Sequence, residues 1–306
     1  MQYRTDLAME QTLHRTGAGV SQRQENLGGV QKTEVIVETE EAAAFLGKPR
    51  GHYITFSMES MVYADGKERM HLSRLVAETL KSLLPGEGEV LVVGLGNRRI
   101  TADALGSRVL DDLLITRHLQ GKGAQEKLPL RSVCALAPGV LGVTGMETAE
   151  VIRGIVHNVK PGAVIAIDAL AARECSRIGN TIQLTDTGIL PGSGVGNHRM
   201  GLNEETLGVK VIAIGVPMVV YAAVIARDAL QMMMQEMGMK EEEHEGAMDA
   251  LMERTLHQTL MDMVVTPREV DEMVGKLARI ISDGINMALQ PGLSYEEMMV
   301  LSHDGL

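Results

Sequence analysis

The stretch from residue 88 to residue 97 constrains the fold more than any other part of the chain. Five apolar residues within it are bounded by glycines, a pattern typical of a strand that is covered on both faces of a parallel sheet. Gly94 and Gly96 allow the backbone to turn sharply where this strand ends. Thr101 can cap the helix that we expect to follow, and Asp103 then lies in the first turn of that helix.

A second stretch, residues 163–173, repeats this design. Its apolar run ends at Asp168, so we expect this carboxylate to come directly off the end of a strand. Open α/β sheets bind their ligands at the carboxyl ends of parallel strands. Asp103 and Asp168 are therefore predicted to meet at one edge of one sheet.

The rest of the chain alternates between strand and helix patterns. Further strands are predicted at residues 33–38, 52–58, 132–137, 180–184 and 210–216, and helices at 69–84, 101–119, 145–159, from Pro217 onward and at 267–289, with a turn or short helix at 40–46. This alternation favours right-handed crossovers. The predicted fold class is α/β, with a mostly parallel sheet flanked by helices, an amino-terminal strand pair and a helical carboxyl-terminal third. The polar residues 1–30 are expected to be mobile or to dock late.

Composition argues against several functions. A formal net charge of −11 gives no general affinity for nucleic acid, and no apolar run approaches the roughly 20 residues that a membrane span needs. Two cysteines without metal-type spacing, and a start that does not resemble a signal peptide, indicate plain thiols in a reducing, cytoplasmic setting. Arg99 stands where a dinucleotide-binding fingerprint would have its third glycine, so no nicotinamide or flavin cofactor is expected.

The two aspartates allow three interpretations. Both could be structural, as a helix cap and as a buried acid satisfied by backbone amides. If they approach within a few ångströms they cannot both ionise cheaply, so the charged one could activate water while the protonated one polarises a carbonyl group. The same carboxylates could instead hold a divalent metal. Asp186, after the predicted strand at 180–184, is a third acid expected near the same edge.

A glycine-dense loop at residues 187–201 is a further candidate site. The backbone amides at Gly192, Ser193 and Gly194 could pair with an extended ligand, and the alternative is a plain surface loop. His198 lies in the same loop. A non-catalytic protein that binds extended peptides through this loop therefore stays open beside the enzyme interpretations.

A series of motifs occurs in one order along the chain: Val93–Asn97, Asp103–Gly106, Thr116–Leu119, Ala137–Val140, Ile167–Arg173, Asp186–Ile189, Pro191–Asn197, Ile212–Pro217 and Val265–Asp271. In these motifs the chain resembles the germination proteases of spore-forming bacteria, from residue 3 to about residue 289. The resemblance implies an endopeptidase that starts the breakdown of small acid-soluble spore proteins during germination.

The resemblance also implies a fold similar to that of the hydrogenase-maturation proteases. The catalytic aspartates proposed for the family match Asp103 and Asp168, with Asn97 in a supporting position and no metal or cofactor. Family members are tetrameric zymogens of the forespore or spore core that trim their own amino termini. A homotetramer is expected here, and the methionine-rich residues 232–239 are a candidate interface.

The family cuts after an acidic residue that is followed by a hydrophobic residue and then alanine. Asp6, Leu7 and Ala8 fit this preference, so the resemblance implies autoprocessing between Asp6 and Leu7. Residues 1–6 would then be a propeptide and residues 7–306 a single peptidase domain. Tyr3 stands where substrates usually carry a further acid, which predicts slow cutting, and Arg4 is a candidate partner for an active-site carboxylate.

Overall fold

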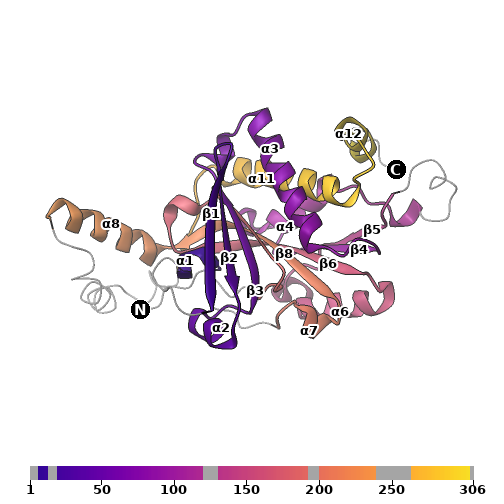
Figure 1. Ribbon diagram of the computed structural model, residues 1–306, viewed down its shortest axis with the longest axis horizontal. Coiled ribbons are helices and arrows are strands. Elements are labelled where there is room, and N and C mark those ends of the chain that lie inside the picture. Colours follow the sequence, from indigo (N-terminus) through magenta and orange to yellow (C-terminus); the bar gives the residue numbers. More distant parts are fainter. Residues whose placement is uncertain (1–5, 13–18, 120–129, 192–199, 239–262, 304–306) are drawn as a thin grey trace.

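The computed structural model describes residues 6–12, 19–119, 130–191, 200–238 and 263–303 (Figure 1). In these ranges one nine-stranded sheet forms the centre of the molecule, with the strand order β1-β2-β3-β7-β8-β6-β4-β5 and with β9 paired to β8. The strands are β1 (Val20–Leu27), β2 (Val30–Val37), β3 (Gly51–Ser57), β4 (Val90–Gly94), β5 (Val133–Leu136), β6 (Ala163–Ala172), β7 (Thr181–Thr185), β8 (Lys210–Tyr221) and β9 (Val264–Val265).

The sheet is mixed, and this corrects the prediction of a mostly parallel sheet. The strands β8, β6, β4 and β5 pair in parallel, whereas β1, β2, β3 and β7 pair antiparallel with their neighbours and join the parallel half through β8. The α/β class itself is confirmed. The strand pair predicted at 33–38 and 52–58 is part of a three-stranded meander, because the polar residues 20–27 form an edge strand whose side chains are mostly exposed.

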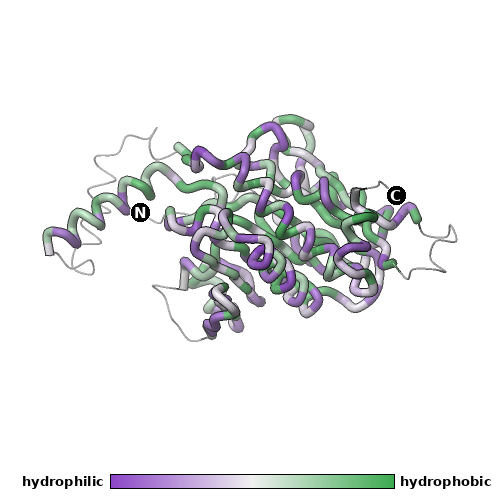
Figure 2. The backbone as a smooth tube through the Cα atoms, turned by 90° about the horizontal axis from the view of Figure 1, so that it is seen from above, coloured by the Kyte–Doolittle hydropathy of each residue, from purple (hydrophilic) through white to green (hydrophobic). Residues whose placement is uncertain are grey.

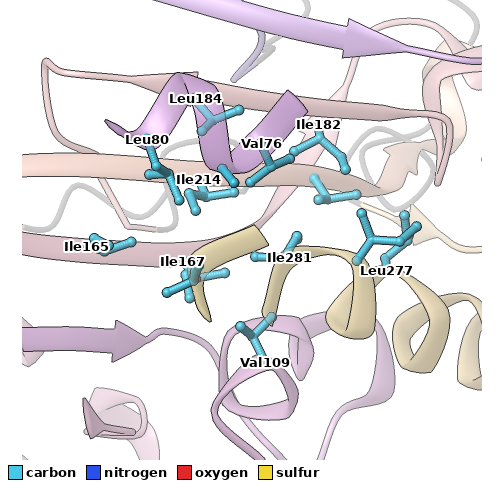
Figure 3. Packing of buried hydrophobic residues seen from close by; sticks show 14 of the residues in the cluster. Val76, Leu80, Val109, Ile165, Ile167, Ile182, Leu184, Ile214, Leu277 and Ile281 are labelled. Atoms are coloured by element: carbon cyan, nitrogen blue, oxygen red, sulfur yellow. The ribbon is translucent and has the colours of Figure 1, made fainter. Parts of the chain in front are cut away.

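Helices cover both faces of the parallel half. On one face α3 (Gly66–Leu83) packs beside α11 (Val270–Leu289), and Val76, Leu80 and Ile281 belong to one buried cluster with Ile165 and Ile214 of the sheet (Figure 3). On the other face lie α6 (Thr148–Val159) and α7 (Glu204–Leu207). Since β4 sends alternate residues into the two clusters, its apolar run is continuous, as the sequence pattern indicated.

The remaining helices are short or peripheral. They are α1 (Ala8–Thr12), α2 (Glu40–Leu46), α4 (Leu105–Val109), α5 (Leu141–Thr144), α8 (Ala222–Glu236) and α12 (Tyr295–His303). The helix α8 extends away from the body of the molecule in both views (Figures 1 and 2). Met232 and Met233 on it and Met237 directly after it are exposed. No helix in the described part of the chain is long and apolar enough to cross a membrane.

Three predicted boundaries are wrong. The helix expected at 101–119 is α4 flanked by short 3₁₀ turns, of which the first is Thr101–Asp103. The strand β8 continues through Pro217 to Tyr221, so α8 begins later than expected. Pro217 lies opposite Leu170 of β6, and the pairing register shifts directly after it, where Met218 has no partner on β6; proline within a sheet is found at such bulges. The helix expected from residue 267 begins at Val270 as α11, and Thr266, just before the expected start, donates its hydroxyl to the Met218 carbonyl oxygen at 2.9 Å.

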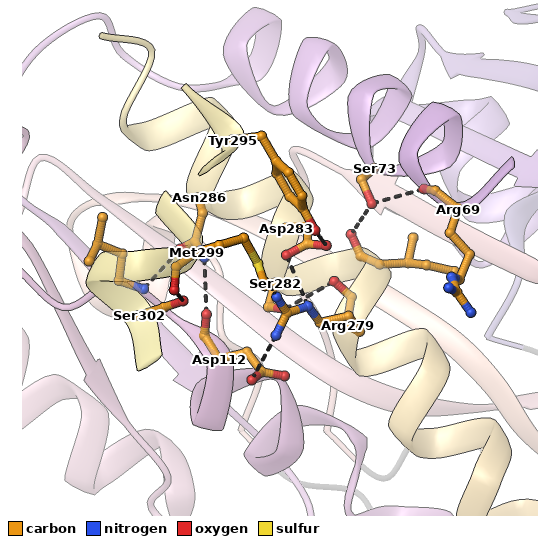
Figure 4. A network of polar contacts seen from close by, with 12 residues as sticks. Arg69, Ser73, Asp112, Arg279, Ser282, Asp283, Asn286, Tyr295, Met299 and Ser302 are labelled. Atoms are coloured by element: carbon orange, nitrogen blue, oxygen red, sulfur yellow. Dashed lines mark hydrogen bonds and ion pairs between the residues drawn. The ribbon is translucent and has the colours of Figure 1, made fainter. Parts of the chain in front are cut away.

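A polar network fixes the segment that follows α4 (Figure 4). The Asn286 side chain accepts from the Leu114 N–H group at 2.9 Å and donates to the Asp112 carbonyl oxygen at 3.0 Å. The Arg279 guanidinium lies 3.1 Å from the Asp112 carboxylate and 3.2 Å from that of Asp283. These contacts join α11 to a stretch without regular secondary structure, which is why the chain there is ordered although no long helix forms.

Two glycines bring α4 against the end of the sheet. A Cβ atom on Gly106 would lie 2.5 Å from the Ile167 carbonyl oxygen and 2.5 Å from the Leu95 nitrogen, closer than real Cβ atoms approach backbone. A Cβ atom on Gly94 would collide with the Gly106 backbone. The helix therefore rests on the ends of β4 and β6 with no side chain between.

Replacing Gly106 with alanine is expected to lower the free energy of unfolding by about 1–3 kcal/mol, because the added methyl group overpacks a contact between rigid backbones. The matched control is Gly154→Ala in α6, where the new Cβ atom meets nothing within 4 Å. That change is expected to stabilise the protein by about 0.4–1 kcal/mol through the unfolded state. Thermal unfolding of both variants checks the opposite signs, and shifts of the same sign would contradict the close packing.

Candidate active site

Asp103 and Asp168 line one cavity of about 510 Å³ beside the carboxyl ends of the parallel strands. Asn97 and Asp6 line the same cavity. Much of the remaining wall is apolar, with Ile100, Leu95, Val140, Leu170, Leu190 and Val219 among the lining residues. The structure therefore brings together the two aspartates that the sequence singled out, in a hollow that suits an apolar side chain.

Asp103 is held by the turn that ends β4. Gly96 has a positive φ of 92°, and its Cα atom packs so closely on Asp103 that a Cβ atom would collide with the Asp103 carbonyl oxygen. This conformation directs the Asn97 N–H group to the Asp103 carboxylate, which accepts at 2.7 Å. A hydrogen bond from a backbone amide favours the charged form of a carboxylate. The predicted turn at the end of this strand is confirmed. Thr101 does not cap a helix, because Asp103 lies in a 3₁₀ turn whose N-cap residue is Ile100.

Asp168 lies within β6. The sequence had suggested that it comes directly off the end of a strand, and this expectation is wrong. The strand continues to Ala172, and the Asp168 side chain is only 6% exposed. Its carboxylate accepts the Ala169 N–H group at 3.0 Å. The neighbouring strand ends beside it, where Leu95 donates to the Ile167 carbonyl oxygen at 2.8 Å. The two aspartates thus reach the cavity from adjacent parallel strands, one from a loop and one from a strand.

The expectation that Asp186 lies near the same edge is wrong. Because β7 runs antiparallel to β8, its carboxyl end points to the opposite edge of the sheet. The Asp186 carboxylate accepts the His52 N–H group at 2.8 Å, and Asp186 is not among the residues that line the cavity. The position of Asp186 is decided by the direction of β7 in the sheet, and the residue pattern did not reveal that direction.

The glycine-dense loop enters the cavity wall at its start. Leu190 and Pro191 line the cavity. The candidates Gly192, Ser193, Gly194 and His198 lie outside the described residues, as does Arg4.

The described residues 6–12 of the amino-terminal segment are docked on the body of the molecule; residues 1–30 were expected to be mobile or to dock late. Leu7 is fully buried, and Ala8 is 2% exposed. Leu7 packs on Leu170 and Val220 beside α8, whereas Ala8 packs among residues of β2, β3 and α2. The Glu10 carboxylate accepts the N–H groups of Arg173 and Glu174, with the shortest contact at 2.9 Å.

Asp6 lies beside β6 at the cavity. Its N–H group donates to the Ala171 carbonyl oxygen at 3.2 Å, and its carboxylate accepts the Ala171 N–H group at 3.0 Å. The Asp6 carbonyl oxygen accepts from Lys48 Nζ at 2.9 Å and from Gln183 Nε2 at 3.4 Å. Gln183 Oε1 accepts the Ala8 N–H group at 2.8 Å. Sequence reasoning missed Lys48 and Gln183, since neither lies in a recognisable motif.

The electrostatics around Lys48 are set by burial. Burial lowers the pKa of the Lys48 ammonium group below its usual range, and the carboxylates of Asp6 and Glu10 act in the opposite direction. Burial also raises the pKa of Tyr53 to about 12, so its phenol stays protonated and donates to the Pro49 carbonyl oxygen at 2.7 Å. The loop that carries Lys48 is thereby tied to the sheet.

Metal ligands do not cluster in the described part of the chain. No group of three or more histidine, cysteine, aspartate or glutamate side chains there has the arrangement of a metal site. The cysteines Cys134 and Cys175 are unpaired thiols, and burial raises the pKa of each to about 11. Both thiols therefore stay protonated at neutral pH.

Comparisons with known proteins place the chain in a family. A [NiFe] hydrogenase maturation protease from Thermococcus kodakarensis is 18% identical, with a TM-score of 0.36 over 68% of this chain and 98% of that one. The germination proteases of Caldanaerobacter subterraneus subsp. tengcongensis and Bacillus subtilis are 42% and 35% identical, covering 98% and 93% of this chain and 98% and 90% of their own. The family model described as germination protease matches residues 2–260. The chain belongs to the germination protease family.

Proposed function

We propose that this protein is a self-activating endopeptidase that starts the degradation of small acid-soluble spore proteins during spore germination. The observation that carries the proposal is the cavity at which Asp103, Asp168 and Asp6 meet. A carboxylate pair and a candidate cleavage site within one chain suit an enzyme that first cuts itself. In this proposal the protein works in the forespore or spore core as a homotetramer, with the exposed methionines of α8 as the candidate interface.

In the proposed reaction the two aspartates activate water. One carboxylate accepts a proton from the water while the water oxygen attacks the carbonyl carbon of the scissile peptide bond. The other carboxyl group, held protonated by its charged neighbour, returns a proton to the departing amine. Because the two groups titrate as a pair, their roles are assigned to the pair and not to either residue. The proposed trigger is a fall in pH into the range in which the pair holds a single proton.

The proposed specificity follows the way in which residues 6–8 are held. Cleavage is proposed after an acid, before a large apolar residue that is followed by alanine. The Leu7 side chain fills an apolar cluster with Leu170 and Val220, and Ala8 occupies a tight space with Val35 and Val37. A large apolar group suits the first space and a methyl group suits the second. Residues 1–6 are the proposed propeptide.

Replacing either Asp103 or Asp168 with asparagine is expected to reduce cleavage of a small acid-soluble spore protein by at least about 10²-fold, because each change removes a group that transfers a proton. Asp186→Asn is the matched control. Its side-chain oxygen can still accept the His52 N–H group, and it lies outside the cavity wall. Near-native activity in either of the first two variants would contradict the carboxylate-pair mechanism.

The native chain is expected to lose residues 1–6 on incubation at mildly acidic pH, and intact mass with amino-terminal sequencing should find Leu7 at the new start. Ala8→Leu should slow this cut. Ala8 is only 2% exposed, so the larger side chain would overpack the space around it. Binding of a spore protein substrate with no cleavage of either chain would instead favour a peptide-binding protein.

Activity is expected to survive removal of divalent cations. Cleavage of the spore protein would be followed before and after dialysis against a chelator, and then after zinc, magnesium or calcium is returned. A loss of activity that one of these ions restores would favour the metal-dependent hydrolase in which Asp103 and Asp168 are ligands.

A further inference from the structure

We propose that Lys48 and Gln183 act on the scissile carbonyl group during self-cleavage, with the Lys48 ammonium group and the Gln183 amide stabilising the negative charge that develops on the Asp6 oxygen. This inference rests on the proposed function, because it takes the Asp6–Leu7 peptide bond as the bond that is cut.

Both donors already contact the atom on which charge would appear. Lys48 Nζ lies 2.9 Å from the Asp6 carbonyl oxygen, and Gln183 Nε2 lies 3.4 Å from it. Donors that are fixed before the reaction and aimed at a developing oxyanion stabilise the transition state more than the ground state. A cation and an amide dipole at this oxygen therefore act where the charge forms.

Gln183 also fixes the position of the bond. Its amide spans the scissile bond, since Nε2 donates to the Asp6 oxygen before the cut and Oε1 accepts the Ala8 N–H group after it at 2.8 Å. The side chain is 5% exposed and projects from β7, between β3 and β8. These contacts involve backbone groups alone, so they hold the Asp6–Leu7 bond whatever its side chains.

The scissile residue is held between two strands of the sheet. On one side its backbone and carboxylate pair with Ala171 of β6, and on the other its carbonyl oxygen meets Lys48 and Gln183. Asp6 lines both the cavity that contains Asp103 and Asp168 and a smaller cavity of about 130 Å³ that Lys48 and Gln183 line. Water and carboxylates can thus approach from the first cavity while the oxygen is polarised from the second.

The charge on Lys48 has two opposing influences. Burial disfavours the charged form and lowers the pKa of the ammonium group, whereas the carboxylates of Asp6 and Glu10 favour the charged form. The Asp6 carbonyl oxygen is a neutral acceptor in the uncut chain and becomes an anion in the tetrahedral intermediate. The interaction with Lys48 therefore strengthens as the reaction proceeds.

The step balances as an ordinary hydrolysis. The water oxygen bonds to the Asp6 carbonyl carbon, a carboxylate takes the water proton, and the π electrons of the carbonyl group move onto the oxygen that Lys48 and Gln183 hold. The intermediate then collapses, the carbon–nitrogen bond breaks, and the Leu7 nitrogen takes a proton. The products are the Asp6 carboxyl group and the Leu7 amine.

The test uses the full chain and follows the first-order loss of residues 1–6 by intact mass. Lys48→Met keeps the apolar stem and removes the charge, and Gln183→Glu keeps the acceptor for the Ala8 N–H group and removes the donor. Each is expected to slow self-cleavage by about 10²–10³-fold, the loss typical for one oxyanion donor. Lys81→Met, at an exposed position of α3, is the matched control and should cleave at the native rate.

Two further measurements separate chemistry from docking. Both use Asp103→Asn, which stays uncut, with and without Lys48→Met. Hydrogen exchange should show the Ala8 amide equally protected in the two proteins, and Lys48→Met should not lower the melting temperature. Self-cleavage of Lys48→Met within about threefold of the native rate would overturn the inference while leaving the proposed function intact. Slow cleavage with lost Ala8 protection would assign Lys48 to docking and overturn it also. A native chain that never cuts between Asp6 and Leu7 would overturn both proposals.

Discussion

The backbone contact between Gly94 and Gly106 is the constraint on which the site depends. It lets α4 and the turn before it rest directly on the ends of β4 and β6, with no side chain between. Asp103 is carried by that turn and Asp168 by β6, so the distance between the two acids is set by how closely the two backbones approach. The apolar clusters on both faces hold the sheet in place, and the polar network around Asn286 and Arg279 holds the chain that leaves α4.

The amino-terminal segment connects the two halves of the sheet across this site. Leu7 belongs to the cluster beside the far ends of β6 and β8, while Ala8 belongs to the cluster of β2, β3 and α2. Glu10 closes the segment through backbone amides and lies 3.4 Å from the Arg177 guanidinium. The contacts of Leu7, Ala8 and Glu10 thus fix the position of the segment around Asp6. In the proposed function this segment is the first substrate of the enzyme.

Local patterns predicted the parts of this structure that depend on local physics. The buried strand β4, the helices α3 and α11, and the turn that carries Asp103 followed from apolar spacing and glycine positions. The pattern failed for β1, because an edge strand exposed on both faces has no apolar alternation, and for the end of β8, because Pro217 looked like a terminator. Strand direction was also hidden, which misplaced Asp186. Lys48 and Gln183 meet residue 6 from 42 and 177 positions away, so no spacing rule could associate them.

The docking of Asp6 in the cavity of its own chain has a kinetic consequence. Because Asp6 lines the same cavity as Asp103 and Asp168, the proposed self-cleavage needs no encounter with a second molecule, and its half-life would not depend on protein concentration. Residues 7–10 are buried, so in the proposed reaction the new amino terminus would stay docked after the cut. Even where diffusion is slow, the rate of the proposed self-cleavage would therefore be set by the protonation of the carboxylates and not by the concentration of the protein.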